Sequence, residues 1–230
     1  MTEIAIAENI SKLAHRIRTS SQKNNRDEGS VKLLAVSKTR PAGAIREAAA
    51  AGITDLGENY LQEALDKIRE LQDLELCWHF IGPIQSNKTR PIAEHFDWVH
   101  SIDRAKVARR LNEQRPADLA PLQVCLQVNI SEEDSKSGAD PRELRGLAAL
   151  VESLPNLKLR GLMAIPAASD DPARQRAAFA ALRRLLEELQ ADHPQMDTLS
   201  MGMSADLESA IAEGATIVRI GTDIFGPRGG

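Results

Sequence analysis

The sequence predicts an α/β protein built as a closed, parallel (β/α)8 barrel. Eight short apolar runs, each typical of a buried strand, alternate with segments whose apolar residues recur at helical spacing. Parallel neighbouring strands need crossover helices between them, and closure of the sheet leaves no open edge. A doubly wound open sheet uses the same alternation and is the alternative architecture.

The elements begin with a helix and continue with a strand. Residues 1–24 carry a stripe of apolar residues on one helical face, and a polar loop follows it. From there strands and helices alternate, and the longest helical pattern covers residues 173–191 and stops near Pro194. The stripe of the first helix consists of Ile6, Ile10, Leu13 and Ile17. The eight predicted strands are residues 31–37, 53–57, 77–81, 97–101, 122–129, 157–164, 197–201 and 215–220.

The last predicted strand is followed by only ten residues, which leaves little room for the final helix of a standard barrel. We expect the helix at residues 1–24 to pack on the barrel and cover this gap. No internal repeat and no low-complexity linker marks a second unit. With 230 residues and 42% hydrophobic content, residues 1–230 are predicted to form one domain.

Composition and charge argue against several classes of partner. The 29 Lys and Arg residues against 33 Asp and Glu residues give a net charge of −4, which provides no basic surface for a phosphate backbone. No apolar run approaches the roughly 18 residues that a membrane span needs, and the amino terminus lacks the apolar core of a signal peptide. We expect a cytoplasmic protein that binds neither nucleic acid nor a membrane.

The cysteines and histidines do not predict a metal site. Cys77 and Cys125 each lie in a short apolar run, where a thiol usually acts as a small buried hydrophobic group. Two cysteines are too few for a metal cluster, and the five histidines show no close pairing with ligand spacing. We therefore predict no structural metal.

Lys38 directly follows the first predicted strand. In a barrel of this kind, functional residues gather at the carboxyl ends of the strands. Burial at such a place lowers the pKa of a lysine in general, and the neutral amine attacks aldehydes. The alternative is an ordinary surface lysine at a strand end.

Two late strand-to-loop segments have the composition of a phosphate site. Gly202 and Gly221 would let backbone N–H groups approach an anion closely. Ser200, Ser204 and Thr222 add hydroxyl donors, and we expect a helix that begins near Ser204 to direct its positive end to the same place. The alternative is that these glycines and serines only make turns and cap helices.

Arg219 lies inside the apolar run TIVRIG, where a charge needs a partner. That partner is either a ligand, through a ring nitrogen or an anion, or a carboxylate on a neighbouring strand. Asn59 and His79 are polar groups next to buried strands and are fit to line a pocket. Asn59 could instead cap the next helix, and His79 could be a core histidine. Lys136 is typical of a solvated loop, with a lid over the site as the alternative.

Eight segments, spaced along most of the chain, resemble one known family. Together they are similar to the pyridoxal phosphate homeostasis proteins, and the likeness runs from residue 31 to residue 226. The chain ends IFGPRGG where that family usually has IFGAR or IFGER, so the last contacts lie outside the likeness. In chain order the segments are AVSKTRP, GENYLQEALDKI, WHFIGPIQSNK, FDWVHSID, NISEEDSKSG, RGLMAIP, TLSMGMSADLESAI and VRIGTDIFG.

The resemblance implies a fold-type III TIM barrel that binds pyridoxal 5'-phosphate (PLP). Such a barrel is similar to the amino-terminal domain of alanine racemase, without the carboxyl-terminal β domain of that enzyme. The resemblance further implies that Lys38 forms a Schiff base with PLP and that Arg219 faces the pyridine nitrogen. The cofactor-binding residues that it implies are Lys38, Asn59, Ser200, Met201, Gly202, Ser204, Arg219, Gly221 and Thr222.

Binding, storage and delivery of PLP are expected rather than turnover. Two-base racemisation needs a second acid opposite the lysine, and the single tyrosine, Tyr60, lies beside the second strand. An arginine at the pyridine nitrogen stays protonated and favours an unprotonated ring, which is a weaker electron sink. The alternatives are an amino-acid racemase using Lys38 with Tyr60 or His79, and a lysine aldolase acting on a sugar phosphate. The expected partners are PLP and the PLP-dependent apo-enzymes that receive it, and we expect a monomer, with a dimer as the alternative.

Overall fold

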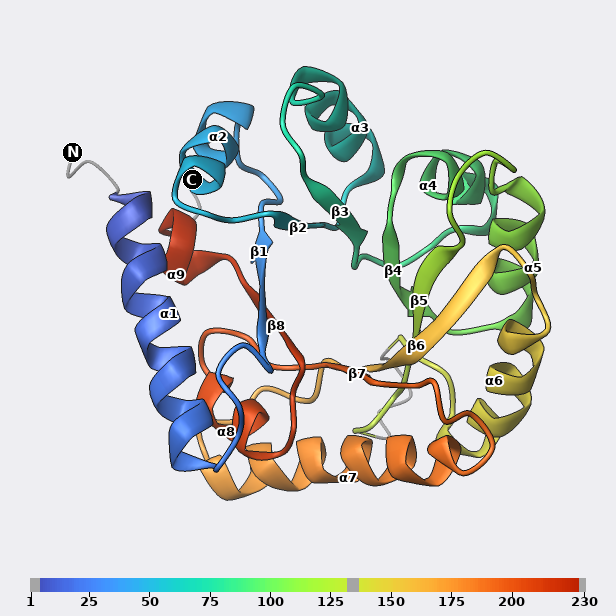
Figure 1. Ribbon diagram of the computed structural model, residues 1–230. Coiled ribbons are helices and arrows are strands. Elements are labelled where there is room, and N and C mark those ends of the chain that lie inside the picture. The colour runs from blue at the N-terminus through green and yellow to red at the C-terminus, as the bar shows by residue number, and fades with distance from the viewer. Residues whose placement is uncertain (1–4, 132–136, 228–230) are drawn as a thin grey trace.

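The computed structural model describes residues 5–131 and 137–227, and it shows the predicted closed barrel (Figure 1). The strands are all parallel and pair in chain order, and the eighth closes the sheet by pairing with the first. All eight predicted strands are confirmed, and the open sheet is wrong. The strands are β1 (Lys32–Val36), β2 (Asp55–Glu58), β3 (Cys77–Phe80), β4 (Trp98–Ile102), β5 (Leu122–Gln127), β6 (Leu157–Met163), β7 (Thr198–Ser200) and β8 (Ile217–Ile220).

The helices surround the barrel and connect its strands (Figure 1). The longest one begins where it does because Asp171 accepts a hydrogen bond from Ala173 N at 2.9 Å and Pro172 supplies the first helical residue. None of the helices in the described part of the chain is both long and apolar enough to cross a membrane. The helices are α1 (Ile6–Lys23), α2 (Ala42–Ala50), α3 (Leu61–Glu70), α4 (Thr89–His95), α5 (Ala105–Gln114), α6 (Leu144–Glu152), α7 (Pro172–Gln190), α8 (Leu207–Ala212) and α9 (Thr222–Phe225).

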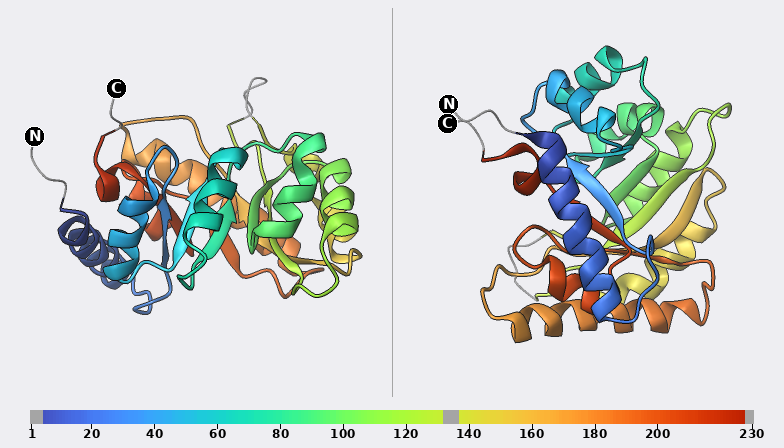
Figure 2. Two further views of the ribbon diagram at one scale, coloured as in Figure 1. Left: turned by 90° about the horizontal axis from the view of Figure 1, so that it is seen from above. Right: turned by 60° about the vertical axis from the view of Figure 1, so that its left-hand side comes forward.

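Helix α1 lies against the outside of the barrel, as predicted. Its buried apolar face contacts α2, α8 and α9, and Figure 2 shows it running beside the last helices of the chain. Asn9 Nδ2 also donates to Ile224 O at 3.0 Å, which joins α1 to α9. Because α9 has only four residues, α1 covers the apolar surface that a longer final helix would otherwise cover.

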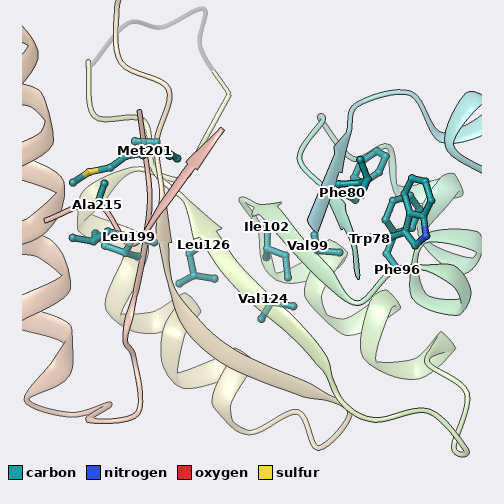
Figure 3. Packing of buried hydrophobic residues seen from close by; sticks show 14 of the residues in the cluster. Trp78, Phe80, Phe96, Val99, Ile102, Val124, Leu126, Leu199, Met201 and Ala215 are labelled. Atoms are coloured by element: carbon teal, nitrogen blue, oxygen red, sulfur yellow. The ribbon is translucent and has the colours of Figure 1, made fainter. Parts of the chain in front are cut away.

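The strands bury side chains on both of their faces, because successive residues of a strand point in opposite directions. The outer layer packs between the strands and the helices, as Figure 3 shows for side chains such as Val124 and Leu199. In this layer, Phe80 and Phe96 meet edge to face with ring centroids 5.3 Å apart. A second, smaller cluster fills the inside of the barrel and contains Leu34, Ile81, Trp98, Cys125, Met163 and Ile217.

Candidate functional site

A cavity of about 290 Å³ opens at the carboxyl ends of the strands. It brings together segments that follow β1, β2, β3, β6, β7 and β8, and six of the nine predicted site residues line it. These six are Lys38, Asn59, Ser204, Arg219, Gly221 and Thr222. Residues that are far apart along the chain, and that were predicted from the sequence as site residues, therefore meet in one cavity.

The charged side chains that line the cavity are all positive. They are Lys38, Arg40 and Arg219, and no carboxylate is among the described lining residues. Three cations around a cavity of this size produce a field that attracts anions. The chemistry of the wall therefore fits a ligand with several negative charges, such as a phosphate ester.

Lys38 begins the turn that follows β1, and both of its neighbours in the chain are held by hydrogen bonds. Ser37 N donates to Gly57 O at 3.0 Å, and Thr39 N donates to Glu63 Oε1 at 2.6 Å. Thr39 has a φ of 64°, a left-handed conformation that costs a residue other than glycine about 1–2 kcal/mol. This strained turn sets the direction in which the Lys38 side chain leaves the strand.

A buried ion cluster, formed by Glu58 and Lys67 with the partly exposed Glu63, holds the turn from the outer side of β1 and β2. Lys67 Nζ donates to Glu58 Oε1 at 2.8 Å and to Ser37 O at 2.7 Å, and it also contacts Glu63. Glu58 in turn accepts from Ser37 Oγ at 2.6 Å. Burial raises the pKa of Glu58, although the hydrogen bonds from Lys67 and Ser37 act in the opposite direction.

Arg219 is 4% exposed and reaches the cavity from β8. Its Nη1 donates to Ser200 Oγ and its Nη2 donates to Ala164 O, each at 2.9 Å. Burial lowers the pKa of the guanidinium to about 10, which leaves it charged at neutral pH. None of its described hydrogen-bond partners is a carboxylate, although the nearby charge of Asp206 acts to raise its pKa against the effect of burial. Its remaining N–H groups are available to a ligand.

The other three predicted site residues, Ser200, Met201 and Gly202, lie behind the cavity wall. Ser200 and Met201 are fully buried, and Ser200 acts as an acceptor for Arg219. Gly202 has a φ of 98°, and its carbonyl accepts a hydrogen bond from Arg219 N at 2.9 Å. The structure therefore gives these residues a place beneath the site, and their direct contact with a ligand stays a prediction.

The segment around Ser204 departs from the expected helix. Helix α8 begins at Leu207, three residues later than predicted, because Met203 N donates to Asp206 Oδ1 at 2.6 Å and closes a turn first. Ser204 therefore faces the cavity from a turn. A helix dipole directed from Ser204 was the wrong expectation.

Asn59 lines the cavity and does not cap the next helix. The residue that precedes α3 is Tyr60, and no side chain makes a cap hydrogen bond there. Asn59 Oδ1 is buried and has no hydrogen-bond partner among the described residues. A buried amide oxygen without a partner is costly, so this group is suited to a ligand that can satisfy it.

The two groups considered as a second catalytic base lie away from the cavity. Tyr60 is 52% exposed and His79 is fully buried, and neither is among the lining residues. His79 is the core histidine that was the alternative at this position, with hydrogen bonds to Asp55 and His100. Lys136, the predicted loop residue, lies outside the described residues.

Asp55, Cys77 and His79 bring three potential metal-binding groups within 4.8 Å of one another. Lys32 Nζ already lies 2.8 Å from Asp55 Oδ1 and puts a positive charge on the same carboxylate. Burial raises the pKa of the Cys77 thiol to about 12, which keeps it protonated and a poor ligand. We therefore do not assign these residues as metal ligands, and the absence of a structural metal stays a prediction.

Sequence reasoning missed Arg40 and the apolar wall of the cavity. Arg40 Nη2 donates to Gly226 O at 2.6 Å and ties the loop after β1 to the end of α9. Its place two residues after Lys38, at the same strand end, was a usable signal. Ile165 and Met203 are more than 40% exposed, and nothing in their local sequence separates them from other apolar residues at strand ends.

Comparison with known proteins now adds to this geometry. Residues 8–229 match the family model described as the alanine racemase N-terminal domain. A pyridoxal phosphate homeostasis protein of Pseudomonas aeruginosa is 66% identical, covering 97% of this chain and 96% of that protein. The protein of the same name from Escherichia coli is 53% identical, covering 97% of both chains.

Solved structures give the same result. PipY of Synechococcus elongatus, solved with PLP bound, is 43% identical and superposes with a TM-score of 0.84, covering 96% of this chain and all of that chain. Alanine racemase of Corynebacterium glutamicum shares the fold at 22% identity and a TM-score of 0.69, and this chain covers 60% of it. The predicted resemblance is confirmed: the chain belongs to the pyridoxal phosphate homeostasis protein family, and its barrel to the alanine racemase N-terminal domain family.

Proposed function

We propose that this protein binds PLP in the cavity at the carboxyl ends of the strands and serves in PLP homeostasis, by holding the cofactor and releasing it. The observation that carries the proposal is the cavity wall, where a lysine from a strand end and two arginines are the charged groups. The PLP named for the relatives and bound in PipY supports the same ligand.

The residues of the cavity fit the chemical groups of PLP. When bound, PLP supplies an aldehyde that condenses reversibly with a primary amine and releases water, and Lys38 provides that amine. Ser204, Gly221 and Thr222 provide hydroxyl and backbone donors for the phosphate. Arg219 provides donors for the pyridine nitrogen, and Asn59 has a buried amide oxygen without a partner. Ser200, Met201 and Gly202 support these groups from behind.

Binding without turnover agrees with the groups around the cavity. Tyr60 and His79 do not line it, so neither is placed to exchange a proton with a substrate there. Arg219 stays protonated and favours an unprotonated pyridine ring, which stabilises a carbanion poorly. Both features disfavour the racemase alternative. They leave Lys38 as a reversible tether for the cofactor.

The setting of this function is also part of the proposal. We infer that the protein works in the cytoplasm as a monomer, with its barrel and α1 forming one domain. The recipients of the released PLP are PLP-dependent apo-enzymes. Transfer of PLP from the loaded protein to a purified apo-enzyme, followed by the activity that the enzyme regains, tests this part directly.

Covalent labelling tests the site. The protein is incubated with PLP, reduced with borohydride, digested and analysed by peptide mass mapping. We expect one phosphopyridoxyl group on Lys38, loss of the label in Lys38→Arg, and no change in the control Lys158→Arg, whose lysine is exposed on β6. A protein that stays colourless and unlabelled contradicts PLP binding, and a label on Lys136 moves the tether to another residue.

Turnover is tested separately from binding. The PLP-loaded protein is incubated with single enantiomers of many amino acids, and the loss of optical activity is followed. We expect none beyond the rate given by free PLP. Sustained racemisation that requires Lys38 would show that the protein is an enzyme and that the carrier role is wrong.

A further inference from the structure

Five polar side chains run through the interior of the barrel, where branched apolar residues usually fill the space. They come from β2, β3, β4, β7 and β8, and each residue is at most 6% exposed. Burial of polar groups is costly unless they are hydrogen-bonded, so a set of this size must be satisfied internally. We call Asp55, His79, His100, Ser200 and Arg219 the polar row.

The polar row is a continuous chain of hydrogen bonds. Arg219 Nη1 donates to Ser200 Oγ at 2.9 Å, and Ser200 Oγ lies 2.7 Å from His100 Nδ1. His100 Nε2 lies 2.9 Å from His79 Nδ1, and His79 Nε2 lies 3.0 Å from Asp55 Oδ1. The chain therefore joins the arginine that lines the cavity to a carboxylate at the first residue of β2.

The two ends of the polar row fix the direction of every hydrogen bond in it. A guanidinium only donates, and an ionised carboxylate only accepts. Burial acts to raise the pKa of Asp55, but hydrogen bonds from His79, Lys32 and Thr54 hold it well below its usual value, so it is ionised. If every hydrogen bond ran the other way, an unprotonated His79 Nε2 would face the carboxylate of Asp55, and two acceptors would meet without a proton between them. We therefore place the proton on Nε2 of both His79 and His100.

Both histidines of the polar row are uncharged. Burial lowers the pKa of His79, although Asp55 acts to raise it, and burial also lowers the pKa of His100 well below its usual value. Beyond Asp55, the ammonium of Lys32 lies 2.8 Å from its carboxylate, and the Lys32 side chain is 47% exposed. The polar row thus links the cavity to an ion pair that meets solvent at the amino-terminal ends of the strands.

We propose that the polar row positions the guanidinium that meets the pyridine ring of PLP, with Ser200, His100, His79 and Asp55 acting on Arg219 through one another. This inference rests on the proposed function, since it concerns bound PLP. Hydrogen bonds in such a chain polarise one another, so the carboxylate at one end makes Ser200 Oγ a stronger acceptor at the other. The stronger hydrogen bond to Ser200 Oγ holds Arg219 Nη1 in place. The remaining N–H groups of the guanidinium are then fixed in one orientation toward the ligand.

A purely structural role is the competing explanation, in which the five side chains only satisfy one another. Asp55 separates the two explanations because it does not line the cavity. If the role is structural, Asp55→Asn changes stability and leaves bound PLP unaffected. If the role is positioning, loss of the terminal charge weakens Ser200 as an acceptor and loosens Arg219.

The first experiment needs no cofactor, because nitrogen NMR of histidine side chains reports the tautomer of each ring. In the protein without PLP at neutral pH, we expect His79 and His100 to be uncharged with the proton on Nε2. We expect Asp55→Asn to populate the other tautomer in at least one of them, since an asparagine can also donate. A charged ring, or a proton on Nδ1 of either histidine in the wild-type protein, overturns the direction of the chain.

The second experiment measures the absorption maximum of bound PLP and the rate of its release. We expect Ser200→Ala to shift the band and to speed release about tenfold, the effect of one lost hydrogen bond. Asp55→Asn should shift the band in the same direction and speed release by about threefold. Its effect is smaller because it reaches Arg219 only through the intervening hydrogen bonds of the polar row. The matched control is His193→Gln, since His193 is a 3% exposed histidine bonded to Glu152 at 2.7 Å and away from the cavity. It should leave both values unchanged.

The outcomes separate this inference from the proposed function. A wild-type protein that takes up no PLP contradicts the proposed function. The NMR result then shows by itself whether the hydrogen bonds of the polar row run from Arg219 toward Asp55. If the wild-type protein binds PLP while Ser200→Ala and Asp55→Asn keep its band and release rate, the positioning role is wrong and PLP binding stands. If Ser200→Ala does not fold, Asp55→Asn alone decides between the two roles.

Discussion

The lysine side and the arginine side of the cavity are built in opposite ways. Beside Lys38, the buried ion cluster brings three charged side chains into contact on the outer face of the barrel wall. Beside Arg219, the neighbours are a serine hydroxyl, a backbone carbonyl and, beyond the serine, a neutral histidine inside the barrel. On the first side the charges pair with one another and fix a turn. On the second side the described hydrogen-bond partners of the charge are uncharged, the Asp206 carboxylate acts on it without a described hydrogen bond, and its remaining N–H groups are left for a ligand.

Strand β2 supplies one carboxylate to each side. Asp55 is its first residue and Glu58 its last, and an odd separation along a strand places the two side chains on opposite faces. Asp55 therefore points into the barrel toward His79, while Glu58 points outward to Lys67 on α3. The pKa of Glu58 is raised by burial, whereas hydrogen bonds keep that of Asp55 low despite burial. Strand β2 thus contributes one carboxylate to the polar row inside the barrel and one to the buried ion cluster outside it.

The largest effect is expected on the lysine side, from Lys67→Met. Removal of this cation leaves Glu58 and Glu63 without a positively charged partner, and breaking a buried ion pair costs about 3–5 kcal/mol. Urea unfolding measures the loss, and slower labelling of Lys38 by PLP and borohydride should accompany it.

The control for this prediction is Lys106→Met, because Lys106 is an exposed lysine on α5. It should change the free energy of unfolding by no more than about 0.5 kcal/mol. The double variant Lys67→Met with Glu58→Gln should recover part of the loss, since it removes the uncompensated charge. Equal stability of the Lys67 and Lys106 variants would mean that the ion cluster does not hold this side.

A smaller effect is expected on the arginine side, from Gly202→Ala. A Cβ at this position would lie 2.5 Å from Ala210 Cβ, and the Gly202 carbonyl holds Arg219 N. Gly214→Ala is the matched control, because Gly214 has the same φ of 98° while its Cβ would approach no atom closer than 3.4 Å. We expect Gly202→Ala to cost about 1–3 kcal/mol more than the control in urea unfolding, and to speed PLP release. Equal losses would assign the whole effect to the backbone conformation.

The difference between the two carboxylates of β2 predicts opposite responses to pH. Asp55 has a lowered pKa, so it stabilises the fold above its ordinary value of 3.8 and loses this contribution as the pH falls. Glu58 has a raised pKa, so its contribution is complete below 4.5 and is lost as the pH rises through the folded value. For either carboxyl, a tenfold difference in acid dissociation constant between the folded and unfolded chain is worth about 1.4 kcal/mol of stability.

Urea unfolding from about pH 3 to about pH 7 measures these responses in the wild type, Asp55→Asn and Glu58→Gln. The advantage of the wild type over Asp55→Asn should shrink toward acid pH. Its stability relative to Glu58→Gln should instead improve toward acid pH. The two differences in the free energy of unfolding, wild type minus each variant, should change with pH in opposite directions. If both change in the same direction, the surroundings of Asp55 and Glu58 do not give them opposite pKa shifts.

The fold and most of the cavity could be predicted because their signals are local. The apolar stripe of α1, with Ile10 and Leu13, and the run that ends in Lys38 can each be recognised within one element. Placement of Lys38, Asn59 and Gly221 in one site follows from the rule that strand ends meet at one mouth of the barrel.

The supports behind the cavity could not be predicted, because they depend on register and on which face a side chain takes. His79 and His100 are 21 residues apart and meet only through the pairing of β3 with β4. Glu58 and Lys67 are surrounded by sequence typical of an exposed helix and a strand end, and nothing local marks them as buried. The missed turn before α8 has a different, local cause, because Asp206 Oδ1 accepts a hydrogen bond from Met203 N three residues earlier and closes a turn where a helix start was expected.

The smallest effect is expected from Arg16→Ala, which tests whether α1 contributes to the arginine side from outside. Arg16 Nη1 donates to Asp223 on α9 at 2.8 Å, and Arg16 Nε donates to Glu208 on α8 at 3.1 Å. The Arg16 side chain is 39% exposed, so solvent screens these pairs and the loss of stability should stay below about 1 kcal/mol. Because α8 and α9 follow the loops that line the cavity, PLP release should still rise by about twofold. Arg18→Ala, which removes an exposed arginine from the same helix, is the control. If both variants release PLP at the wild-type rate, α1 covers the barrel without influencing the site, and the arginine side is held from within the barrel alone.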